Sequence, residues 1–228
     1  MADKSRNLKD IWRMGEFVDE ALDRKGIDQD KLKSYMPRMF EIVRTREGKD
    51  PIAMYEEIMV IMEEEWPASD HLPVHGAWHH ALVPGILIRC LQNSGEDFNE
   101  EDVQEALQRG IMIPGGSCGF HGVCGAAVGA GVAVSIVERT TPLHDQERST
   151  ALRVNARAQA CIAELGGSRC CPRATYATFE LATMELGAIG HPLAFTGARG
   201  RCKFSDKNQD CIKERCPFYP RRDLNGSD

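Results

Sequence analysis

The feature that most constrains the fold is an uncharged segment at residues 122–137, with the sequence GVCGAAVGAGVAVSIV. It is too short and too rich in glycine for a transmembrane helix, which needs about 20 mainly apolar residues. Gly125 and Gly129 lie four residues apart among alanines, so one face of a helix here carries only small side chains. We therefore expect residues 126–137 to form the buried central helix of a bundle, closely approached by another helix or a cofactor.

Apolar residues recur at helical spacing through most of the remaining chain. Asn99 followed by Asp102 is typical of a capped helix start, and Pro51 suits the first turn of a helix. The pattern predicts an all-α, single-domain protein with cysteine-rich loops and an irregular, metal-binding C-terminal tail. The expected helices cover residues 11–25, 32–45, 51–66, 78–90, 99–110, 145–165 and a segment that begins near Pro172.

Three parts of the chain differ in composition. We expect residues 1–69 to be a helical appendage packed on the core, residues 70–220 to be a metal-binding helical domain, and residues 221–228 to be a polar tail.

With 228 residues, 42% hydrophobic content and a net charge of −6, the chain is not disordered. Residues 150–228 carry 12 basic and 8 acidic side chains, a local charge of +4.

That local basic excess coincides with most of the cysteines, which indicates compensation for an anionic metal centre or ligand. Only 7% of the residues are aromatic and no dense basic stripe is present, so neither nucleic acid nor membrane is expected as a partner. The first residues, MADKSRNLKD, are charged and no apolar stretch follows, which predicts a cytoplasmic location. Disulfides rarely persist there, so clustered cysteines favour metal or redox chemistry.

None of the nine cysteines precedes Cys90. Cys90 and Cys161 lie in apolar helices and are expected in the core. The other seven stand at helix starts, glycine turns or in the polar tail, and we predict them to be metal ligands: Cys118, Cys124, Cys170, Cys171, Cys202, Cys211 and Cys216.

A glycine turn precedes the first of these ligands. Gly115, Gly116 and Ser117 lead into a helix, where free backbone N–H groups attract an anionic cofactor and lower the pKa of the Cys118 thiol. The adjacent pair Cys170 and Cys171 cannot easily point at one ion, so one of them is expected to bind the metal while the other packs or reacts. The neighbouring side chains of Arg169 and Arg173 supply positive charge for a thiolate or an anionic substrate.

The tail spacing C-x8-C-x4-C-P lies in a polar stretch that is expected to need a metal or cross-link to become ordered. Zinc would take Cys202, Cys211 and Cys216 with His191 or Cys170. An iron–sulfur cluster, most simply [4Fe-4S], suits the looser spacing and the Cys-Pro pair. The C-x2-C units of zinc ribbons and bacterial ferredoxins are absent, so spacing leaves both metals open and favours iron–sulfur.

Histidines form a second cluster. His75 and His79 are four residues apart, His80 follows, and His121 lies between Cys118 and Cys124. They are candidates for acid–base catalysis or substrate binding. Ordinary capping and packing contacts are the alternative for His79 and His80.

The segments HGAWHHALVPGIL, PGGSCGFHGVCGAAVGAGVAVSI, RCCPR and the tail pattern ending in CPFYP resemble an uncharacterised cysteine-rich domain family of anaerobic bacteria and methanogens. Its members occur alone or attached to methyltransferase-like or radical-SAM-like domains. The resemblance covers about residues 70–220 and leaves the N-terminal helices outside. It implies anaerobic metabolism and an iron–sulfur centre, and it carries no established reaction.

Three functions remain open from the sequence. The first is an iron–sulfur enzyme or accessory factor of anaerobic sulfur or one-carbon metabolism, of the lyase or sulfur-transfer type, acting on a small anionic or sulfur-containing substrate. The second is a zinc-stabilised, non-catalytic module that docks a protein partner through its Met-rich N-terminal helices. The third is a metal-free thiol enzyme that uses Cys118. A homodimer is compatible with each.

Overall fold

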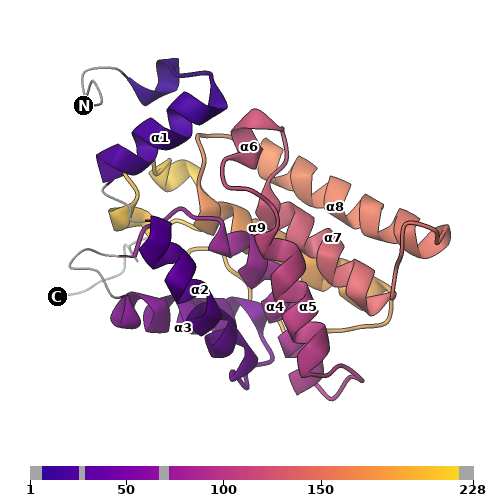
Figure 1. Cartoon of the computed structure of the whole chain (residues 1–228). Helices are drawn as coiled ribbons and strands as arrows, with labels where there is room; N and C mark the ends of the chain where they lie inside the picture. Colours follow the sequence, from indigo (N-terminus) through magenta and orange to yellow (C-terminus); the bar gives the residue numbers. More distant parts are fainter. Residues whose placement is uncertain (1–6, 26–28, 67–71, 221–228) are drawn as a thin grey trace.

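The computed structural model describes residues 7–25, 29–66 and 72–220, which contain nine α-helices and no strand. The prediction of an all-α protein is confirmed (Figure 1). The expected polar tail at residues 221–228 lies outside the described residues. The helices are α1 (Met14–Lys25), α2 (Gln29–Arg44), α3 (Pro51–Glu65), α4 (Trp78–Asn93), α5 (Glu100–Ile111), α6 (Ser117–Phe120), α7 (Gly125–Val137), α8 (Gln146–Glu164) and α9 (Cys171–Ala188).

Helices α4 and α7 form the centre of the bundle. α4 contacts α2, α3, α5, α7 and α9, and α7 contacts α4, α5, α8 and α9. Leu82, Val83 and Ile86 of α4 are completely buried, as are Ala130 and Ala133 of α7. The expected burial of the uncharged glycine-rich helix is therefore confirmed.

Small residues explain how closely these helices approach one another. A Cβ atom added to Gly129 would lie 2.8 Å from the Pro84 side chain of α4. One added to Gly131 would lie 2.9 Å from Asn155 of α8, on another side of the helix. Glycines thus let α7 pack against α4 and α8 at once, since any larger residue would push the axes apart.

Most methionines of α2 and α3 face inward, whereas Met14 of α1 is exposed. Met39 of α2 and Met54, Met59 and Met62 of α3 are buried in the core. These methionines are thus part of the core, and docking of a partner through the N-terminal helices stays a prediction. None of the helices in the described residues combines the length and the apolar character needed to cross a bilayer.

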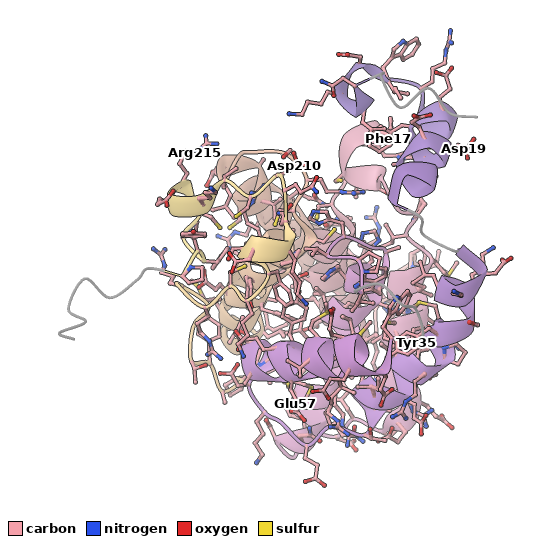
Figure 2. All side chains as sticks on the ribbon, turned by 90° about the vertical axis from the view of Figure 1, so that its left-hand side faces the viewer. Phe17, Asp19, Tyr35, Glu57, Asp210 and Arg215 are labelled. Atoms are coloured by element: carbon pink, nitrogen blue, oxygen red, sulfur yellow. The ribbon has the colours of Figure 1, made fainter. Side chains whose placement is uncertain are left out.

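Helix α1 stands beside the bundle rather than inside it (Figure 2). Its Phe17 ring packs edge-on against Phe120 of α6, with ring centroids 5.4 Å apart. Trp12, just before α1, is 75% exposed. α1 therefore packs against the short helix that carries Cys118, and Cys118 itself stays exposed.

Candidate metal centre and a second thiol group

A small pocket lies between the first turn of α9 and the C-terminal tail, and four cysteines line it. It contains about 340 Å³ of space, counting its open mouth. Figure 2 views the tail, in yellow, with Asp210 and Arg215 on the loop that holds two of these cysteines. We call this site the four-thiol pocket; its cysteines are Cys170, Cys202, Cys211 and Cys216.

Cys170 comes directly before the first residue of α9, so its sulfur lies where that helix begins. Burial raises the pKa of its thiol, while the backbone N–H and the guanidinium of Arg173 lower it. The Arg173 side chain is buried and donates a hydrogen bond of 2.7 Å to the Ser168 carbonyl. A buried cation next to the pocket favours a negatively charged group inside it.

The tail cysteines are held by backbone hydrogen bonds. The Cys202 N–H donates to the Phe218 carbonyl (2.8 Å), which joins the two ends of the tail. The Lys213 N–H donates to Cys211 Sγ at 3.4 Å, and the Cys216 N–H donates to the Lys213 carbonyl at 2.7 Å. The loop between Cys211 and Cys216 thus turns both cysteines toward one pocket.

Burial and the neighbouring thiols act together on Cys202. Burial, with a smaller effect of the thiols of Cys170, Cys216 and Cys211, raises the pKa of Cys202 to about 12, although the Phe204 N–H lowers it. Four sulfurs close enough to oppose one another's ionisation need a cation among them to become thiolates.

Aromatic packing orders the tail on the bundle. Phe218 is 1% exposed and its ring centroid lies 5.5 Å from that of Tyr176 in α9. Phe204 packs 5.9 Å from Tyr55 of α3. The tail therefore has more hydrophobic reason to become ordered than its polar composition suggests, because Phe218 lies in the core and the part-buried Phe204 packs against it. That the tail binds a metal stays a prediction.

A buried carboxylate holds the segment around Cys202. Glu56 of α3 is 4% exposed and accepts hydrogen bonds from Arg201 (2.8 Å) and from the Tyr176 hydroxyl (3.2 Å). Lys203 lies 3.3 Å from the same carboxylate. The two residues that flank Cys202 are thus bound to one acidic side chain, which fixes the position of that cysteine.

A hydrogen-bond chain runs from α9 through His75 to the pocket. The Cys171 N–H donates to His75 Nδ1 (3.4 Å), which leaves the proton of a neutral ring on Nε2. His75 Nε2 lies 3.2 Å from the Asn208 Oδ1 atom, which also accepts from the Asp210 N–H. Asn208 Nδ2 consequently faces Cys170 Sγ, at 3.5 Å. His75 therefore orients an amide next to a pocket cysteine.

His79 and His80, both predicted as catalytic residues, lie in the core. His79 Nε2 donates to the Val74 carbonyl at 3.1 Å, and burial lowers its pKa to about 3. His80 Nδ1 donates to the Ile113 carbonyl at 2.9 Å, and burial again lowers the pKa. Both rings are neutral and paired with backbone, which is the packing alternative. The fourth predicted histidine, His121, is exposed.

Three predicted ligands do not line the four-thiol pocket, and we call them the second thiol group: Cys118, Cys124 and Cys171. Burial, with a smaller effect of the thiols of Cys124 and Cys118, raises the pKa of Cys171 to about 12, although Arg169 lowers it. Cys171 follows Cys170 directly, so one peptide bond connects the second thiol group to the four-thiol pocket. The seven predicted ligands are thus divided between two groups.

The predicted anion-binding turn lies beside the second thiol group. Gly116 has a φ of +86°, which requires glycine, and it precedes the four-residue helix α6. Ser117 is buried and its hydroxyl donates to the Pro114 carbonyl. Gly115 and Arg169 are exposed. None of these four residues lines the four-thiol pocket, whereas Arg173 does.

Sequence reasoning missed Asn208, Glu56 and Gln159. Gln159 of α8 pairs with both backbone groups of Cys124, accepting from its N–H (2.9 Å) and donating to its carbonyl (3.2 Å). Burial of Glu56 could have been predicted from the sequence, because it lies on the apolar face of α3, four residues after Ile52. Asn208 and Gln159 had none, since amides are common in loops and on helix surfaces.

Zinc and an iron–sulfur cluster differ in the spacing of the sulfurs that they need. Within the three described stretches of chain, no three His, Cys, Asp or Glu side chains are placed to hold a metal ion. A tetrahedral zinc ion with bonds of about 2.3 Å needs its sulfurs within about 3.8 Å of one another. A cubane needs wider spacing, because each thiolate binds a different iron.

Comparison with known proteins gives a family and no function. Residues 39–219 match a family of unknown function, DUF5714. The match includes α3 and part of α2, which the resemblance seen in the sequence left outside. No curated protein and no solved structure matches the chain. Because the match spans most of its length, the chain belongs to the DUF5714 family of unknown function.

Proposed function

We propose that this chain is an iron–sulfur protein whose four-thiol pocket binds one [4Fe-4S] cluster for electron transfer. The observation that carries the proposal is that one pocket is lined by four cysteines from three separate segments of chain. Four cysteines are the full ligand set of such a cluster. Arg173 and the Asn208 amide supply the positive charge and the N–H group that an anionic cluster needs nearby.

Electron transfer is favoured over substrate chemistry by the lining of the pocket. Ligation by all four cysteines leaves no iron open to bind a substrate. The described residues that line the pocket include no His, Asp, Glu or Lys, and Tyr219 is the acid–base candidate that remains there besides the four cysteines. A lyase or sulfur-transfer reaction at this pocket thus has no support, whereas an accessory redox protein needs only the cluster and a partner.

The setting of this activity is a proposal that rests on the sequence. We place the protein in the cytoplasm, where the free thiols of the pocket persist. Anaerobic sulfur or one-carbon metabolism follows from the resemblance to a family of anaerobic bacteria and methanogens.

Metal analysis of anaerobically prepared full-length protein tests the proposal. We expect about four iron and four acid-labile sulfide per chain, with a broad visible absorption that bleaches on reduction. Serine at position 170, 202, 211 or 216 is expected to lower the iron content. Cys161→Ser is the matched control, because Cys161 lies part-buried on α8 outside both thiol groups. A colourless protein with one zinc per chain would establish the zinc alternative instead.

A further inference from the structure

We infer that Cys118 and Cys124 form a reversible thiol–disulfide site that reacts with low-molecular-weight disulfides. This site is separate from the four-thiol pocket, since neither residue lines that pocket. It does not require a bound cluster, so the inference goes beyond the proposed function.

The loop between α6 and α7 closes on itself. The Ser117 carbonyl accepts the N–H of His121 at 2.9 Å and the N–H of Val123 at 3.2 Å. The hydrogen bond from Val123 to Ser117 joins the residues that directly precede the two cysteines. Ser117 precedes Cys118, and Val123 precedes Cys124. Backbone closure therefore brings the two cysteines near each other before any disulfide exists.

Glycine makes this closure possible. Gly116 and Gly122 have φ values of +86° and +65°, in the left-handed region that other residues rarely adopt. A Cβ atom at Gly122 would meet no neighbour within 4 Å, so its backbone angle rather than crowding requires glycine there. The chain thus turns at both ends of the loop that separates the two thiols.

The two thiols have different surroundings. Cys118 is exposed, whereas Cys124 is part-buried and its backbone is held by Gln159. Burial raises the pKa of the Cys124 thiol, whereas the backbone N–H groups of Ala127 and Ala126 lower it. An exposed thiol can react with a small disulfide reagent to form a mixed disulfide. A second thiol held nearby can then attack that mixed disulfide and release the reagent.

The reaction is a balanced exchange. The Cys118 thiolate attacks a disulfide R–S–S–R, forms a mixed disulfide and releases one thiolate RS⁻. The Cys124 thiolate then attacks Cys118 Sγ, which forms the Cys118–Cys124 disulfide and releases the second RS⁻. Two protein thiols are oxidised, one R–S–S–R is reduced to two RSH, and the protons pass from the cysteines to the released thiolates.

Oxidised glutathione is the probe for the test. Full-length protein with its native metal is treated with it, alkylated and digested with chymotrypsin, which cleaves between the two cysteines at Phe120. We expect a Cys118–Cys124 linked peptide pair and two glutathione thiols released per chain, with unchanged metal content. Cys124→Ser should release one and retain glutathione on Cys118, Cys118→Ser should release none from this site, and Cys161→Ser should match the wild-type protein.

Three results would overturn the inference: no reaction at Cys118, a stable glutathione adduct on it in the wild-type protein, or a disulfide from Cys118 to Cys171. The wild-type peptide map decides among them even if a variant fails to fold. Metal content, measured on the same samples, tests the iron–sulfur proposal separately.

Discussion

Asn208 donates its Nδ2 hydrogen to the Sγ atom of Cys170 across 3.5 Å, and Asn208 itself is buried. Hydrogen bonds to ligand sulfur tune both the affinity for a metal centre and its reduction potential. This amide is therefore a side-chain partner of the proposed cluster, and His75 sets its orientation.

Replacing Asn208 with leucine is expected to lower metal affinity roughly tenfold and to shift the midpoint potential of the bound cluster to a more negative value. The reason is the loss of an N–H group that stabilises negative charge on sulfur. Anaerobic metal titration and dye-mediated redox titration measure the two effects. Gln209→Leu is the control, because Gln209 is the exposed neighbour. Equal potentials in both variants would contradict this role for Asn208.

Replacing Glu56 with glutamine is expected to destabilise the protein by about 1–3 kcal/mol. It removes the buried negative charge that holds Arg201 and Lys203. Chemical denaturation measures the loss, and limited proteolysis should cut the tail faster. Glu57→Gln removes an exposed partner of Arg46 and should cost about 0.5 kcal/mol or less. If the two variants lose equal stability, Glu56 does not anchor the tail.

Alanine at Gly110 is expected to cost about 1–3 kcal/mol, or more, despite the better helix propensity of alanine. Its Cβ would lie 2.3 Å from the His80 carbonyl oxygen, and a backbone atom of a buried helix cannot move aside. Gly187→Ala in α9 meets nothing within 4 Å and should stabilise the protein by about 0.5–1 kcal/mol. Thermal unfolding of both variants measures the difference, and a stabilised Gly110→Ala protein would show that α4 and α5 do not pack this closely.

The buried His79 predicts loss of stability in mild acid. Its pKa is about 3 in the folded protein and about 6.5 when unfolded, so between these values the unfolded state binds more protons. The free energy of unfolding should consequently fall as pH decreases from about 6.5, by about 3 kcal/mol at pH 4. Urea unfolding of His79→Gln should show a flatter decline. His121→Gln, at an exposed position, should keep the wild-type decline; identical curves for all three proteins would exclude the effect.

Much of the helical fold follows from sequence periodicity. The expected helix at residues 126–137 is α7, and the helix start placed near Trp78 is the first residue of α4. The Asn99–Asp102 capping box also forms. The helix that should end at Gly110 continues one residue further, because Gly110 is required by the contact with α4 rather than as a stop.

The site was less predictable, because its arrangement depends on contacts between distant segments. Local spacing identified seven cysteines, but it could not show that Cys170 lines the tail pocket while Cys171 belongs to the second thiol group. Helical spacing placed His75 with His79, whereas His75 lies before the first turn of α4 and contacts the tail. The amides that hold the cysteines act through hydrogen bonds that no sequence pattern predicts.

The salt bridge between Glu56 and Arg201 joins residues that are 145 positions apart. Because the core helices precede the tail in the chain, they leave the ribosome first and can fold before Cys202, Cys211 and Cys216 are available. The surface that receives the tail is then present before the tail arrives. Loading of the proposed cluster is consequently expected to follow the folding of the core, with the folded helices as the template on which the four-thiol pocket is completed.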